Sequence, residues 1–186
     1  MKSPISFLSR LLLPRLRLFT CLVIVLSTIG CDSADPFERD PEPLIQTNAL
    51  SYTLEQASGG LMVEIPYTYE NLTGGPVYHS NCNGAFSISL ERFEAKTWKA
   101  AWYPFLQTCL SPPIEIREGE IWETSLLVWG APPDTNTDPA FDVVDPTGVY
   151  RIVWNEALSS YQDQYPFGQI IDLEHRISNR FQLKTE

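Results

Sequence analysis

The sequence predicts an all-β domain, an immunoglobulin-like antiparallel β-sandwich of about eight or nine strands. Two observations predict it. Between residues 49 and 186, apolar residues recur at every second position in short runs, and Gly, Pro and Asn separate the runs. No long stretch repeats apolar residues at the helical period, apart from a segment around 155–164 that could form a short helix.

The first strands are expected at 50–54 and 61–69, joined by a Gly-containing turn, with a short third strand at 76–82. Pro66 interrupts the second run. Because proline cannot donate a hydrogen bond to the ladder, we expect that strand to lie at an edge or to carry a bulge.

Further strands are expected, in chain order, at 86–90, 98–103, 113–116, 121–130, 148–154 and 176–183. The polar residues 94–97 indicate a hairpin loop. Side chains two positions apart in a strand share a face of the sheet. Trp98 and Trp102 are therefore predicted on one face, and Trp129 on the face opposite to Trp122.

Three segments carry a family resemblance: YTYENLTGGPVY, EIREGEIWETSLLVW and GVYRIVW. They contain, in order, a strand ending in an Asn-containing turn, an Ile-x-x-Gly-Glu turn and a late Gly-x-Tyr strand. This succession resembles the Ig-like domains of bacterial envelope proteins and, more distantly, the intracellular proteinase inhibitor (BsuPI) type. The resemblance implies the sandwich fold, and a fold alone does not define a function.

Residues 1–30 have the pattern of a secretory signal peptide. Their only charges are Lys2, Arg10, Arg15 and Arg17, and an apolar run follows at 18–30. This run is shorter than the roughly twenty residues that a membrane-spanning helix needs. We therefore expect cleavage at its end instead of a permanent span.

The run ends in LSTIG followed by Cys31, which resembles the lipobox of bacterial lipoproteins, although Thr28 stands where Leu, Val or Ile is usual. The resemblance implies that Cys31 is lipidated and anchors the mature chain to a membrane of the cell envelope, inner or outer. Each buried acyl methylene contributes about 0.8 kcal/mol, so several chains hold a protein firmly. Residues 31–48 contain three prolines and five carboxylates, and they predict an extended acidic tether before a domain at 49–186.

Two cysteines remain once Cys21 leaves with the signal and Cys31 carries lipid. We expect these two, Cys82 and Cys109, to form a disulfide in an oxidising compartment. A reactive thiol or a metal site is the alternative, but neither a C-x-x-C spacing nor a flanking histidine favours it.

Charge and motifs argue against several functions. The chain has a formal net charge of −10, and loss of residues 1–30 would leave 9 basic against 23 acidic residues, which disfavours nucleic-acid binding. The sequence contains no nucleophile elbow, zinc-protease motif, phosphate loop or dinucleotide fingerprint. Its two histidines, His79 and His175, lie in no catalytic motif. We therefore do not expect an enzyme.

A loop at 134–145 is a calcium candidate. Five oxygen-bearing side chains stand at the spacing of ligands in an EF-hand-like loop: Asp134, Asn136, Asp138, Asp142 and Asp145. Pro139 stands where that loop requires glycine, so an acidic surface loop with Asx turns is the alternative. If calcium binds, we expect weak binding that orders the loop. No other cofactor is predicted.

These expectations give the hypothesis of a lipid-anchored, non-catalytic interaction or structural module, with an unidentified envelope protein as its partner. Its contact surface would be an edge strand or the long loop 130–148. Two alternatives stay open. The family resemblance allows a protease-inhibitor-like domain, and exposed tryptophans would allow a glycan-binding module, unless those rings pack in the core.

Overall fold

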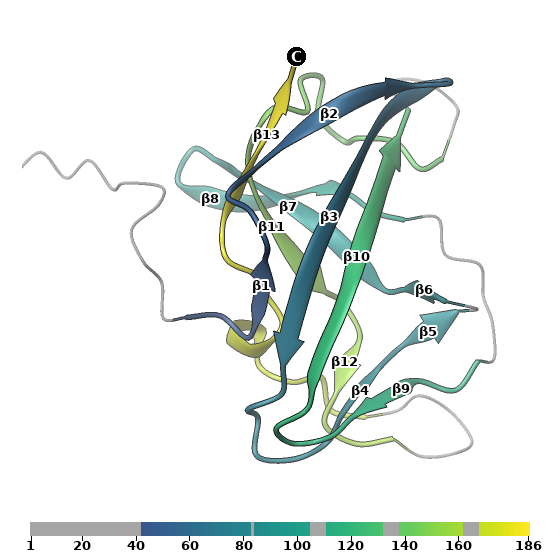
Figure 1. Cartoon of the computed structure of the whole chain (residues 1–186), viewed down its shortest axis with the longest axis vertical. Helices are drawn as coiled ribbons and strands as arrows, with labels where there is room; N and C mark the ends of the chain where they lie inside the picture. The colour runs from purple at the N-terminus through teal and green to yellow at the C-terminus, as the bar shows by residue number, and fades with distance from the viewer. Residues whose placement is uncertain (1–41, 83, 105–110, 132–137, 162–167) are drawn as a thin grey trace, which may run out of the picture. The chain divides into compact units, whose positions relative to one another are not determined.

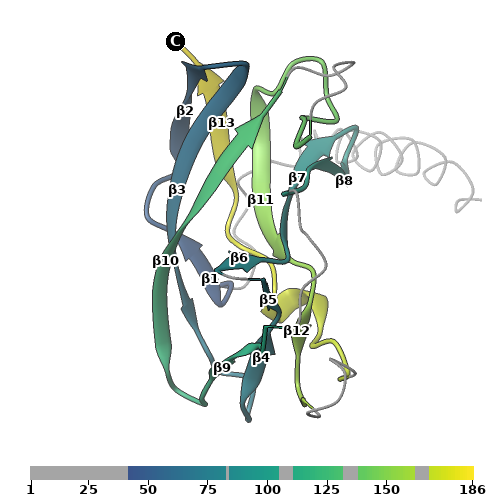
Figure 2. The ribbon, with the colours of Figure 1, turned by 90° about the vertical axis from the view of Figure 1, so that its right-hand side faces the viewer.

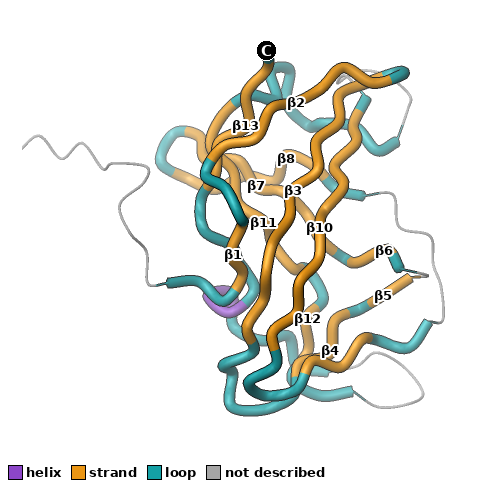
Figure 3. Tube along the Cα trace, viewed as in Figure 1, coloured by secondary structure: helices purple, strands orange, loops and turns teal. Residues whose placement is uncertain are grey.

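The computed structural model describes residues 42–82, 84–104, 111–131, 138–161 and 168–186, all within one compact unit, Phe37–Glu186. Strands dominate these residues (Figure 3). In chain order the elements are β1 (Ile45–Thr47), β2 (Ser51–Ala57), β3 (Gly60–Glu70), β4 (Val77–His79), β5 (Asn81–Cys82), β6 (Ala85–Phe86), β7 (Ile88–Glu94), β8 (Thr97–Trp102), β9 (Ile114–Ile116), β10 (Ile121–Gly130), β11 (Gly148–Trp154), β12 (Ala157–Leu158), the 3-10 turn η1 (Leu173–His175) and β13 (Phe181–Thr185). Within the described ranges, no helix has the length and apolar character needed to cross a membrane.

Two sheets, joined through β2, make up the sandwich (Figures 1 and 2). In the first sheet, β3 pairs antiparallel with β10 along the whole length of β10, from Glu70 opposite Ile121 to Leu61 opposite Gly130. The other side of β3 is shared by β1 and β2. The second sheet has the order β2-β13-β11-β7-β8. The predicted all-β sandwich is therefore confirmed.

The strand order is immunoglobulin-like. β3 and β10 take the places of strands B and E, and β7, β11 and β13 take those of C, F and G. One pair of this antiparallel sandwich is parallel, because the first half of β2 runs in the same direction as β13. There β2 passes from the first sheet to the second, where it lies beside β13 and runs in the same direction. Two smaller sheets, β12-β4-β9 and β5-β6, complete the fold.

The core lies between the two sheets and is rich in aromatic rings. Tyr67 and Tyr69 on β3 face Trp154 on β11, with ring centroids 6.4 Å and 4.4 Å from the indole. Tyr150, also on β11, is fully buried, and its hydroxyl donates to the carbonyl oxygen of Pro146 at 2.8 Å. This bond is the tyrosine corner of immunoglobulin-type sandwiches, and it fixes how the chain enters β11.

A buried asparagine joins two turns at one end of the first sheet. The Nδ2 group of Asn71 donates to the carbonyl oxygens of Gly75 and Ile116, each at 2.8 Å. Its Oδ1 accepts from the backbone N–H of Thr73 at 3.1 Å and from the Thr73 hydroxyl at 2.8 Å. The backbone of Asn71 also bonds Gly119 and Glu120. The Asn-containing turn and the Ile-x-x-Gly-Glu turn are therefore one hydrogen-bonded unit.

The domain begins earlier than predicted. Residues 45–47, expected to end the tether, form β1, and Ile45 is fully buried. A single apolar pair in an acidic, proline-containing segment has no alternation, so the periodicity gave no sign of a strand there. The predicted signal peptide and residues 31–41 of the predicted tether lie outside the described residues.

Pro66 lies in a central strand, so the prediction of an edge position is wrong. Its carbonyl oxygen accepts from the backbone N–H of Asn48 at 3.1 Å, on the side of β3 that faces β1 and β2. The N–H and C=O of one strand residue point to the same side. The missing N–H of Pro66 therefore falls at the junction where β1 has ended and β2 has not begun to pair with β3.

Two other expectations differ from the structure. A bulge at β8 puts Ala101 between the pairs Glu91–Ala100 and Leu90–Trp102, so the alternation shifts and Trp102 turns into the core, away from the face of Trp98. Residues 155–161, expected to begin a short helix, form a turn and β12 instead. The remainder of that segment up to 164 lies outside the described residues.

Candidate functional site

Several predicted site residues lie outside the part of the chain that the structure describes. Cys31, the predicted lipidation site, is one of them, and Cys109 is another. Cys82, at the end of β5, is disulfide-bonded. Its pairing with Cys109 stays a prediction, because nothing is described for the second cysteine.

The calcium candidate is described in part, since Asp134 and Asn136 lie outside the described residues. Three carboxylates remain, those of Asp138, Asp142 and Asp145. Among the described residues, none of them belongs to a group of three or more potential metal ligands whose ligand atoms lie within 4.8 Å of one another. The exposed carboxylate of Asp145 accepts from the backbone N–H of Thr147 at 2.9 Å, and this hydrogen bond lowers its pKa. Asp145 is thus used as a turn residue, and a calcium site in this loop stays a prediction.

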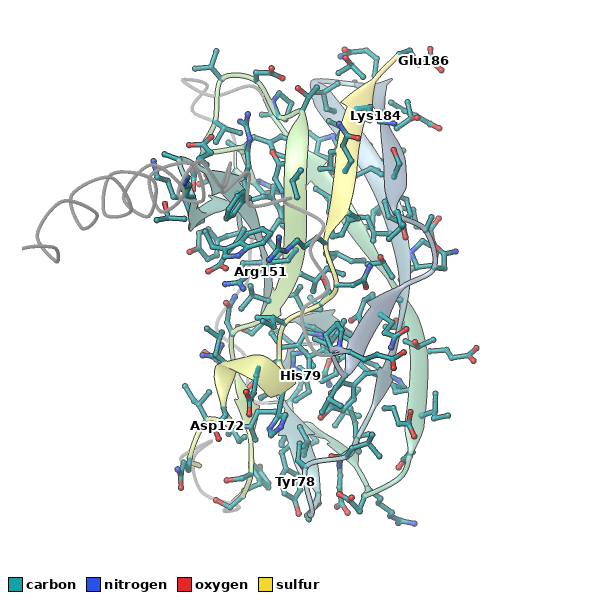
Figure 4. The ribbon with its side chains drawn as sticks, turned by 90° about the vertical axis from the view of Figure 1, so that its left-hand side faces the viewer. Tyr78, His79, Arg151, Asp172, Lys184 and Glu186 are labelled. Carbon is teal, nitrogen blue, oxygen red and sulfur yellow. The ribbon has the colours of Figure 1, made fainter. Side chains whose placement is uncertain are left out.

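Among the described residues, one cluster offers three potential metal ligands close together. Asp172, Glu174 and His175 lie on or beside η1, and their ligand atoms are within 4.8 Å of one another (Figure 4). The His175 Nε2 atom is 3.8 Å from a carboxylate oxygen of Glu174. Both carboxylates are solvent-exposed, so this arrangement is that of a solvated turn.

His79 lies in the core and is unsuited to proton transfer with a substrate from solvent. It is fully buried on β4, with the rings of Trp154 and Phe86 at centroid distances of 4.1 Å and 5.1 Å. Neither ring nitrogen has a hydrogen-bond partner in the described residues. Burial away from water lowers the pKa of His79 to about 3, so the imidazole is neutral at physiological pH.

The tryptophans divide between the core and the outer faces. Trp102 and Trp154 are buried, whereas Trp98 and Trp129 are half-buried on outer faces. The guanidinium of Arg151 lies 4.4 Å from the centre of the Trp98 ring, on the outside of the second sheet (Figure 4). Arg151 is also paired with Glu91 at 2.6 Å. The ring face that a sugar would stack on is therefore already covered at Trp98.

A shallow hollow lies beside β12. Its volume is about 510 Å³, and the residues that line it are Ser80, Glu156, Leu158, Ser160, Gly168, Gln169 and Ile170. Glu156 is the one titratable side chain among these lining residues. The hollow is open to solvent.

The long edge of β10 is the feature with the clearest capacity to bind another molecule. Within the described residues, β10 pairs with β3 and with no strand on its other side. Figure 2 views the domain from that side, with β10 along the margin of the first sheet. A strand in this position presents a row of backbone N–H and C=O groups.

The register shows which residues present those groups. Pro66 directs its backbone toward β1 and β2, and Ser125 is its direct partner on β10. In an antiparallel pair, two directly opposed residues point either toward each other or both away. Ser125 therefore directs its N–H and C=O to the free edge, and so does every second residue along β10, from Ile121 to Trp129.

One end of this edge is closed. The carbonyl oxygen of Trp129 accepts from the indole Nε1 of Trp102 at 2.8 Å. Just beyond β10, Ala131 forms a bridge with Ala140. The stretch available for pairing therefore runs from Ile121 to Leu127, which is as long as a typical strand. We call this stretch, residues 121–127, the open edge.

No family model matches this chain, and the comparisons with curated proteins and with solved structures give no match either. The fold and the geometry alone thus define the class of protein: an immunoglobulin-like β-sandwich with an open sheet edge. The sequence indicated this strand but not its place at the edge of a sheet. Residues 121–130 alternate without a proline or lysine, and they carry a single charge, Glu123.

Proposed function

We propose that this chain is a lipid-anchored, non-catalytic binding module of the bacterial cell envelope, which holds an extended segment of a partner protein by strand addition to the open edge. The proposed location rests on the sequence, where residues 1–30 and Cys31 have the pattern of a lipoprotein signal. The open edge supports the proposed mode of binding. Strand addition uses backbone hydrogen bonds for affinity and alternate side chains for specificity.

The observation that carries the proposal is the absence of protection along the open edge. Natural sandwiches block their edges with lysines, prolines, bulges, inward-pointing charges or very short strands. The described pairing of β10 with β3 has no bulge, and the side chains that point inward from β10 are Trp122, Thr124, Leu126 and Val128. None of them is charged.

The other margin of the sandwich serves as an internal comparison. β8 is six residues long, carries the bulge at Ala101, and has Lys99 on it and Lys96 in its turn. These are the devices that discourage pairing with another chain. In the part of the chain that the structure describes, one margin is therefore protected and the other is open, as expected for a margin that pairs with a partner.

In addition, the outer side of the open edge is apolar at both ends. Ile121 and Leu127 are each 60 % exposed. Exposed large apolar side chains beside an unpaired edge favour association, because a partner strand would cover them.

The test is site-specific photocrosslinking in the native envelope. A photoreactive residue placed at Leu127 should crosslink one dominant protein, whereas the same residue at Leu173, which is 46 % exposed and lies on η1, should not. A second change, Ser125→Pro, removes an N–H that points to the free edge and none that pairs with β3, so the sandwich should survive it. Ser125→Ala is the matched comparison, because it removes the hydroxyl and keeps the N–H.

We expect the crosslink at Leu127 to be at least tenfold weaker with Ser125→Pro than with Ser125→Ala. Circular dichroism and the urea midpoint of both variants establish that they are folded. A crosslink of equal strength in the two variants would mean that binding does not use the edge. Absence of any crosslink at Leu127 in the native envelope would refute the proposed function.

A further inference from the structure

We infer that the partner segment at the open edge is a strand of about seven residues with a basic residue at its third and fifth positions and apolar residues around them. This inference rests on the proposed function and specifies its partner. It follows from the side chains that would lie beside each position of a strand added to the open edge.

The outer face determines the basic positions. Along the open edge the outer side chains are Ile121, Glu123, Ser125 and Leu127. The Ser125 hydroxyl donates to a carboxylate oxygen of Glu64 at 2.7 Å, so this carboxylate on β3 leans toward the edge. Glu123 is acidic, and the Glu64 carboxylate lies beside Ser125. An added strand would place side chains about 5 Å from Glu123 and Ser125, so a lysine or arginine could pair with Glu123 directly or reach across Ser125 to Glu64.

The ends of the open edge determine the outer apolar positions. An added strand that faces Ser125 and Glu123 with its third and fifth residues faces Leu127 and Ile121 with its first and seventh. Both of these β10 side chains are exposed and apolar, so the favoured neighbours are apolar. The pattern reads the same from either end, so it holds for a parallel and for an antiparallel addition.

The inner face determines the even positions. Trp122 and Thr124 point toward the core from β10 but are only half-buried, and Leu126 is 8 % exposed. Phe86 on β6 packs edge-on against Trp122 at a centroid distance of 4.9 Å and is itself half-buried. These rings leave apolar surface at the margin of the core. The second, fourth and sixth residues of a partner strand would cover that surface, and β-branched apolar side chains suit it.

Charge also distinguishes this partner from other occupants. The chain's own residues 32–43 contain three prolines and five carboxylates, so they suit neither a ladder nor an acidic edge. A second copy of this chain would bring the same acidic face, on a protein with 13 basic against 23 acidic residues. A basic segment of another protein meets no such repulsion.

The experiment uses three labelled peptides with the full-length protein in mild detergent, read by fluorescence anisotropy. All share the frame Val-Val-X-Val-X-Val-Val between Gly-Ser flanks, where X is Lys, Ser or Glu. We expect the Lys peptide to bind at least about fivefold more tightly than the Glu peptide, with the Ser peptide between them. This advantage should shrink at 0.5 M salt, because exposed charges are then screened.

Protein variants locate the effect. Glu123→Lys should reverse the order of the Lys and Glu peptides. Glu174→Lys changes the net charge equally but lies on η1, so it should leave the order as it is. Ser125→Pro should weaken all three peptides.

The outcomes separate the two proposals. If the three peptides bind equally and Ser125→Pro weakens them, strand addition stands and the basic pattern is wrong. If none binds, or if Ser125→Pro has no effect, strand addition itself is wrong. If the protein sediments as a dimer that Ser125→Pro dissociates, the occupant is a second copy and the inferred partner is wrong.

Discussion

Replacement of Asn71 by alanine should lower the free energy of unfolding of the sandwich by about 3 to 4 kcal/mol. The side chain makes four hydrogen bonds, two donated to carbonyl oxygens and two accepted from Thr73. A typical hydrogen bond contributes about 1 kcal/mol net, and a buried partner left unpaired adds to the loss. The carbonyl oxygen of Ile116 is such a partner, because its bond to Asn71 is buried.

Asn71→Asp separates the two halves of this network. The substituted side chain has the same shape and can still accept from Thr73, but its second oxygen would face the carbonyl oxygens of Gly75 and Ile116 at 2.8 Å. This contact raises the pKa of the carboxyl group above its ordinary value of about 3.9. A raised folded pKa means that the variant is most stable below pH 4 and loses stability as the pH rises.

The assay is urea unfolding followed by tryptophan fluorescence, at pH 4 and at pH 7. We expect Asn71→Asp to be less stable than Asn71→Ala at pH 7 and to recover part of the difference at pH 4. Thr73→Ala removes only the hydroxyl bond, so it should lose less than either. A loss below about 1 kcal/mol for Asn71→Ala would refute the role of this side chain in joining the turns.

Three further predictions concern other parts of the chain. His79→Phe should reduce the stability that the protein loses between pH 7 and pH 4 by about 3 kcal/mol. The reason is that the unfolded histidine takes up a proton near pH 6.5, whereas the folded one does so at about pH 3. Urea titrations that give the variant and the wild type the same loss of stability between these pH values would contradict this prediction. Tyr150→Phe removes the tyrosine-corner bond to Pro146 and should lower the free energy of unfolding by about 1 kcal/mol, measured by the same urea method. Cys31→Ala should abolish incorporation of labelled palmitate in cells, and labelling of the variant equal to the wild type would remove the proposed anchor.

The sequence predicted most of the strands because their two faces differ. Alternation in 61–69 and 121–130 corresponds to β3 and β10, whose inner residues, such as Ile65 and Val128, are buried, and the turn at Gly119 falls where a turn was expected. In β10, Trp122 and Trp129 lie on opposite faces, as predicted, since the strand has no bulge in its pairing with β3. Alternation in the sequence predicts the face on which a side chain lies only where the strand pairs without a bulge.

Where the prediction failed, long-range contacts decided the structure. Pro66 is tolerated in the middle of a sheet only because two short strands meet beside it, which no local pattern reveals. The bulge at Ala101 reverses the face of Trp102. The open edge depends on which strands do not pair, so the alternation of 121–130 indicated a strand without indicating its place in the sheet.

The parallel pairing of β2 with β13 has a consequence for the order of folding. It joins residues 51–54 to residues 182–185, so β2 cannot complete its pairing until β13 has been made. A chain that grows from its N-terminus cannot complete the second sheet until residues 182–185 are available. Contacts of such high sequence separation slow folding. Loss of residues 182–186 would therefore leave residues 51–54 of β2 without a partner strand and β11 paired with β7 alone. We expect such a truncated chain to be a target for proteases.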